Sequence, residues 1–121
     1  MEVLKLHKQD PGMRPGDLIS VSYGGAGISY VSVCIDIHKS TETGNLILNH
    51  YVFNWGRREL PKDLTVQWLR RSGDRIYGEY VPDRVCYASD RMLTSENKTI
   101  YNAIKQVLEN EYKNYWATDP V

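Results

Sequence analysis

Two pairs of arginines, each placed shortly after a tryptophan, are the residues of this chain best suited to chemistry. The six residues are Trp55, Arg57, Arg58, Trp68, Arg70 and Arg71, and Arg75 crowds the same turn as the second pair. A planar guanidinium beside an aromatic ring holds phosphate groups and stacks on nucleic-acid bases. We therefore consider a site for RNA or for a nucleotide-like ligand at these positions. The structural alternative is that the arginines only pair with nearby acids such as Asp63, Asp74 and Glu79.

Tyrosines form a second candidate surface. The chain has nine Tyr and three Trp but a single Phe. Tyr and Trp suit half-buried binding positions, because each carries a polar group at the edge of a large apolar ring. Tyr23 and Tyr30 flank a glycine-rich stretch. We expect them to line one side of the fold together with Tyr51, Trp55 and Trp68. Such a surface would bind another protein or a second copy of this chain. β-sheets also favour Tyr on structural grounds.

No spacing typical of a catalytic or metal site is present. The histidines and cysteines are isolated from one another, with no HxH, HxxxH or CxxC pattern. They are His7, His38, His50, Cys34 and Cys86. The glycines at 24–27 precede a strand rather than a helix, so they favour a hairpin turn over a phosphate loop. We predict no catalytic residue, no metal and no cofactor, and we favour a binding protein over an enzyme.

The length and the net charge of the chain further limit the kind of protein it can be. The chain has 121 residues, which suits one domain over 1–121. Its 15 basic residues balance 15 acidic ones, which argues against a non-specific polyanion binder. There is no apolar run of signal-peptide or membrane-span type. We therefore expect a cytoplasmic protein with no membrane partner.

Alternating apolar and polar residues, broken by turn residues, predict a sheet of short antiparallel strands. The expected strands are residues 18–23, 28–37, 45–55, 64–70, 75–81 and 84–88. Strand 28–37 is the clearest, and its alternation predicts one buried set and one opposite set of side chains. The buried set is Val31, Val33, Ile35 and Ile37, and the opposite set is Tyr30, Ser32, Cys34 and Asp36.

A change to a 3.6-residue period predicts a helix over residues 94–116, with Ile100, Ile104 and Leu108 on its apolar face. Thr94 or Ser95 can cap its start. We expect an α+β domain in which residues 15–88 form an antiparallel barrel or a strongly bent sheet. The C-terminal α-helix is expected to pack on that sheet.

The segments PGDL, YVSVCIDI, NWGRREL and PKDLTVQW, within residues 15–70, resemble the SH3-like small barrel of Tudor- and KOW-type modules and of many small phage proteins. The resemblance implies an SH3-like β-barrel and a role in binding. It also implies a phage-encoded accessory or structural protein, located in the host cytoplasm or the virion.

Two enzyme families share fragments of this pattern. Ribonuclease toxins of the MazF and PemK kind are similar in the basic turn at 14–17 and the terminal helix, which would imply endoribonuclease activity. Their catalytic arginine has no counterpart, because residues 29–37 contain no Arg. NlpC/P60 peptidases are similar in PGDL, GISYV and His50, but their nucleophilic Cys is absent and Tyr30 stands where they have His.

The predicted function is a non-enzymatic binding module that acts through an aromatic and arginine surface. The alternatives are a binder of nucleic acid or of a small phosphate-bearing ligand, and a MazF-like endoribonuclease.

Overall fold

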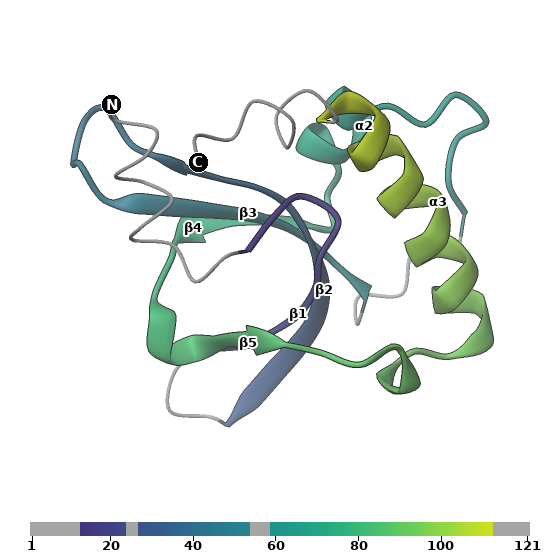
Figure 1. Cartoon of the computed structure of the whole chain (residues 1–121), viewed down its shortest axis with the longest axis horizontal. Helices are drawn as coiled ribbons and strands as arrows, with labels where there is room; N and C mark the ends of the chain where they lie inside the picture. Colours follow the sequence, from purple (N-terminus) through teal and green to yellow (C-terminus); the bar gives the residue numbers. More distant parts are fainter. Residues whose placement is uncertain (1–12, 24–26, 54–58, 113–121) are drawn as a thin grey trace, which may run out of the picture.

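The computed structural model describes residues 13–23, 27–53 and 59–112, which form a bent antiparallel β-sheet with its α-helices on the convex face (Figure 1). The strands are β1 (Leu18–Tyr23), β2 (Ile28–Lys39), β3 (Leu46–Val52), β4 (Arg75–Glu79) and β5 (Val85–Tyr87). The helices are α2 (Val66–Arg71), α3 (Ser95–Glu111) and the short 3₁₀ turns η3 (Pro82–Arg84) and η4 (Asp90–Met92). The predicted α+β class with a C-terminal helix is confirmed.

The sheet has the order β4-β3-β2-β1-β5. Within the described residues β4 and β5 are the two edges and are not paired with each other, so the sheet is not closed into a barrel. Figure 1 shows it curled instead, with β4 and β3 on one arm and β1 and β5 on the other. Of the two sheet forms predicted, the strongly bent sheet is the one observed.

The predicted hairpin of β1 and β2 is confirmed, with antiparallel pairs running from Leu18–Val33 to Tyr23–Ile28. Residues 24–26 of its loop lie outside the described part of the chain. The turn that leads into β1 has Pro15 followed by Gly16 at φ 96°, the order that a type II turn requires.

This turn is tied to the last helix. The hydroxyl of Tyr101 in α3 donates to the carbonyl of Gly16 at 2.9 Å. At the other end of the turn, the amide of Arg14 donates to the carboxylate of Asp17 at 2.8 Å. The start of the sheet is therefore held by side chains from both nearby and distant sequence.

The prediction of a strand over 64–70 is wrong, because this segment contains helix α2. Thr65 caps the helix by accepting a hydrogen bond from the amide of Trp68 at 3.1 Å. Val66 and Leu69 are buried one helical turn apart. Short apolar runs fit either period, and here the cap and the contact with the core select the helix.

A β-bulge interrupts β2 at Ile35. Cys34 pairs with His50 and Asp36 pairs with Asn49, so one residue of β2 has no counterpart on β3. The predicted alternation is therefore wrong beyond Ile35. Ile35 still packs under the helices, but Ile37 packs on the concave side and Asp36 faces α2.

Two apolar clusters cover the two faces of the sheet. The cluster under the helices is centred on Val33, Ile35, Tyr51, Leu69, Ile104 and Leu108. The smaller cluster on the concave side comprises Met13, Ile19, Val21, Cys34, Leu48 and Tyr80. Each such buried side chain stabilises the fold by roughly 1.5–3 kcal/mol. None of the helices in the described residues is long and apolar enough to cross a membrane.

Candidate functional site

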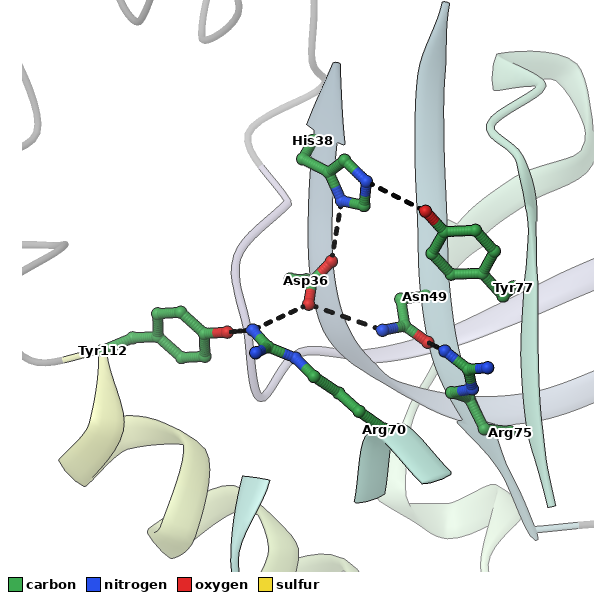
Figure 2. Close-up of polar contacts among 7 residues, drawn as sticks. All are labelled: Asp36, His38, Asn49, Arg70, Arg75, Tyr77 and Tyr112. Atoms are coloured by element: carbon green, nitrogen blue, oxygen red, sulfur yellow. Dashed lines mark hydrogen bonds and ion pairs between the residues drawn. The ribbon is translucent and has the colours of Figure 1, made fainter. Parts of the chain in front are cut away.

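A polar hollow of about 420 Å³ lies where β2, β3 and β4 meet α2 and the end of α3. Figure 2 shows seven polar and aromatic residues that gather there from these five elements. They are Asp36, His38, Asn49, Arg70, Arg75, Tyr77 and Tyr112. Its volume falls in the range of small-ligand pockets, roughly 300–1,000 Å³.

Asp36 is the centre of the network, and its side chain is only 16% exposed. One carboxylate oxygen, Oδ2, accepts from Arg70 Nη2 at 3.2 Å and from Asn49 Nδ2 at 3.5 Å. The other, Oδ1, lies 3.1 Å from His38 Nδ1. The bulge at Ile35 brings this carboxylate to the helix side of the sheet, where α2 supplies the guanidinium.

His38 continues the network towards solvent. Its Nε2 lies 3.3 Å from the hydroxyl of Tyr77, and its side chain is 45% exposed. A carboxylate on one ring nitrogen fixes the orientation of an imidazole. The arrangement therefore presents an oriented imidazole at the hollow, held by Asp36 on one side and Tyr77 on the other.

Arg70 and Tyr112 form the wall of the hollow on the side of the helices. The guanidinium of Arg70 donates to the hydroxyl of Tyr112 and lies 5.9 Å from the centre of that ring. Burial, and then the negative charge of Asp36, raise the pKa of Tyr112 to about 12. The phenol thus stays protonated at neutral pH.

Arg75 stands on the opposite side, on the edge strand β4. Its Nη1 donates to Asn49 Oδ1 at 3.5 Å, and its guanidinium lies 5.1 Å from the ring centre of Tyr77. Its Nε is buried without a hydrogen-bond partner, and no carboxylate of the described residues pairs with this guanidinium. The hollow therefore contains two guanidiniums against the single carboxylate of Asp36.

Of the predicted site residues that the structure describes, Arg70 lines this hollow, together with Arg75, which follows the next turn in the sequence. Arg71 lies on the same helix as Arg70, but it is exposed and does not line the hollow. Trp68 is half-buried against the cluster under the helices, with its ring 6.5 Å from that of Tyr51. Three of the predicted residues lie outside the described part of the chain: Trp55, Arg57 and Arg58.

The predicted tyrosine pair belongs to a different place. The rings of Tyr23 and Tyr30 are 5.5 Å apart, and Tyr23 packs on the concave cluster. Tyr51 instead packs under the helices. The expectation that Tyr23, Tyr51 and Trp68 share one side is therefore wrong, because the sheet separates them.

Sequence reasoning missed most of the hollow, although a signal was available. Asp36 with His38, and Arg75 with Tyr77, are pairs two residues apart within strands, a spacing that puts both side chains on one face. Only the pairing of β2, β3 and β4 shows that the two pairs meet. Within the described residues there is no group of three or more His, Cys, Asp or Glu side chains that could hold a metal ion.

Comparison with known proteins identifies no family for this chain. A scan against protein-family models finds no match, and searches of curated proteins and of solved structures find none either.

Proposed function

We propose that this protein is a binding module whose polar hollow takes a phosphate-bearing ligand with a planar aromatic part, such as a nucleotide or a segment of single-stranded RNA. One observation carries the proposal. Arg75 presents to the hollow a guanidinium that has no carboxylate partner among the described residues. Guanidinium groups bind phosphate oxygens in pairs.

The rest of the hollow fits the same ligand. Arg70 is held in place by Asp36 and Tyr112, so its position is set before a ligand arrives. The exposed ring of Tyr77 offers a surface on which a base can stack. We also propose that the bent sheet is an open variant of the SH3-like barrel predicted from residues 15–70, a class whose members bind peptides through aromatic grooves.

Calorimetric titration with 5′-AMP, inorganic phosphate and adenosine separates the anionic and aromatic parts of the ligand. We expect 5′-AMP to bind more tightly than either fragment, with an affinity that falls as salt is raised. Arg75→Gln should weaken 5′-AMP binding by about 10-fold to 100-fold, because a charge-assisted hydrogen bond is worth about 1.5–3 kcal/mol.

Arg71→Gln is the matched control, since Arg71 is exposed and does not line the hollow. Equal losses in Arg71→Gln and Arg75→Gln, or no binding of 5′-AMP or a short RNA by the wild-type chain, would contradict the proposal. A double variant, Arg57→Ala with Arg58→Ala, tests the other predicted arginine pair separately. Loss of binding in the double variant alone would move the site to that pair.

A second candidate function is metal-independent RNA cleavage, and the Asp36–His38 pair favours it. His38 would take the proton of a ribose 2′-hydroxyl while the 2′-oxygen forms a bond to phosphorus. The bond between phosphorus and the 5′-oxygen then breaks, and that oxygen takes up a proton from water, leaving a 2′,3′-cyclic phosphate. Incubation with a long RNA in the presence of EDTA tests this. His38→Gln should abolish cleavage but not binding, and an uncut RNA would remove the candidate.

A protein partner, self-association and a phage origin stay predictions. Light scattering of the purified protein measures its mass in solution, and a strictly monomeric mass would contradict the expected homo-oligomer.

A further inference from the structure

The edge strand β4 directs part of its backbone away from the sheet (Figure 1). In an antiparallel ladder, residues alternate between pairs that exchange backbone hydrogen bonds and pairs that do not. The carbonyl of Asp74, just before β4, accepts from β3 at 2.9 Å, and the amide of Tyr80, just after it, donates to β3 at 2.8 Å. The even-numbered residues of β4 therefore face β3, and the backbone N–H and C=O groups of Tyr77 and Glu79 point outwards.

The outward backbone groups of Tyr77 and Glu79 form no hydrogen bond within the described part of the chain. Arg75 differs, because its amide donates to the carbonyl of Ser72 at 3.2 Å. An open edge pairs readily with another strand, and many proteins prevent this with a proline, a lysine or a bulge. β4 has the sequence RIYGE and pairs with β3 without a bulge, so it lacks all three. This edge is therefore open to the addition of a strand.

The side chains of β4 fit a second copy of the same strand. Alternation places Arg75, Tyr77 and Glu79 on one face, where Tyr77 and Glu79 are exposed and Arg75 is half-buried. In antiparallel pairing about a twofold axis at Tyr77, Arg75 of each copy lies opposite Glu79 of the other, and the two Tyr77 rings are neighbours. Residues directly opposite have Cβ atoms about 4.5–5.5 Å apart, and opposite charges and aromatic pairs at this distance stabilise a sheet.

The same register also suits the backbone. Tyr77 can exchange two hydrogen bonds with Tyr77 of the other copy, because its N–H and C=O groups both point outwards. The amide of Glu79 meets the carbonyl of Arg75 in the other copy. A shift of the register by two residues would remove both pairs of opposite charges, so the charges favour this register over its neighbours.

We propose that two copies of this chain form a twofold dimer through antiparallel pairing of their β4 strands, which joins the two sheets. Within the described residues of one copy neither Arg75 nor Glu79 forms an ion pair, and the dimer supplies each with a partner of opposite charge. An anionic ligand of the hollow and a second copy therefore compete for Arg75. The dimer itself does not depend on the function proposed for the hollow.

Sedimentation velocity of the full chain without nucleotide measures the dissociation constant of the dimer. Glu79→Arg sets an arginine opposite Arg75, and Arg75→Glu sets a glutamate opposite Glu79, so each variant should weaken self-association by at least about tenfold. An equimolar mixture of these two variants restores both pairs of opposite charges and should associate as the wild type does. Glu109→Arg makes the same charge change at an exposed position of α3 and should leave the association unchanged.

Hydrogen exchange followed by NMR tests the paired strand itself. The amides of Tyr77 and Glu79 should exchange more slowly as the protein concentration is raised, because the dimer gives them acceptors. The amides of Ile76 and Gly78 face β3 and should be protected at every concentration. In Glu79→Arg the dependence on concentration should disappear.

Three results would overturn the proposal. The first is a wild-type chain that stays monomeric at about 1 mM protein. The second is a mixture of Glu79→Arg and Arg75→Glu that associates no better than either variant alone. The third is a dimer whose formation leaves the exchange of the Tyr77 and Glu79 amides unchanged, which would place the interface elsewhere.

Discussion

Asp36 Oδ2 lies 3.2 Å from Nη2 of Arg70, and this contact joins the middle of the sheet to helix α2. It exists because the bulge at Ile35 turns Asp36 towards the helices. Without the extra residue, strict alternation would place this carboxylate on the concave side beside Cys34. The same contact keeps Arg70 at the edge of the hollow while it lowers the hollow's net positive charge.

Asp36→Asn should have opposite effects on stability and on anion binding. We expect a loss of about 1–2 kcal/mol in the free energy of unfolding, because Arg70 and His38 lose a charged partner that is largely buried. Affinity for 5′-AMP should rise, because the carboxylate no longer competes for the guanidinium. Urea unfolding and calorimetry measure the two effects. Glu42→Gln, on an exposed loop, is the control, and weaker anion binding in Asp36→Asn would contradict the account.

His50 should make the protein less stable as the pH falls. Its folded-state pKa of about 4 lies below the ordinary value of 6.5, so the unfolded chain binds more protons between these two pH values. Stability is therefore full above pH 6.5 and falls as the pH drops to about 4. The shift corresponds to about 3 kcal/mol.

Urea unfolding from pH 4 to 8 measures the free energy of unfolding of the wild-type chain and of His50→Gln. Because the carboxylates titrate in both proteins, the difference between the two isolates the effect of His50. The difference between the two proteins should change only below pH 6.5. A constant difference across the whole range would show that His50 does not titrate in this way.

Gly16→Ala should destabilise the turn that leads into β1. Gly16 has φ 96°, and an L-residue in this region of the backbone costs about 1–2 kcal/mol. Gly73→Ala is the matched control, because Gly73 is not among the described residues with positive φ and a Cβ there meets open space. Thermal unfolding of the two variants gives the comparison. Equal melting temperatures would contradict the predicted backbone strain.

Thr94→Ala should weaken helix α3. Thr94 Oγ1 accepts from the amide of Asn97 at 3.1 Å, and the loss of an N-cap costs about 1 kcal/mol. Ser95→Ala, one position later on an exposed site, should change the free energy of unfolding by less than about 0.5 kcal/mol. Chemical denaturation monitored by circular dichroism measures both. A larger loss in Ser95→Ala would mean that the helix starts one residue later.

Much of the fold was predictable because its signals are local. The hairpin of β1 and β2 follows from alternation on both sides of a glycine-rich loop, and helix α3 follows from Ile100, Ile104 and Leu108 recurring on one face. Helix α2 was not predictable in the same way. Its few residues fit both periods, and the buried contacts of Val66 and Leu69 favour the helix.

The sequence by itself determined the α+β class, the hairpin, the capped C-terminal helix and the presence of arginines available for an anion. Only the tertiary structure decided which of them meet. Arg70 and Arg75 come together with Asp36 because a bulge, a short helix and the pairing of β4 with β3 converge on one face. The physical reason is that a bulge sets two residues of one strand against one residue of a distant strand and so reverses the alternation beyond it. The alternation within β2 alone does not show where that extra residue falls.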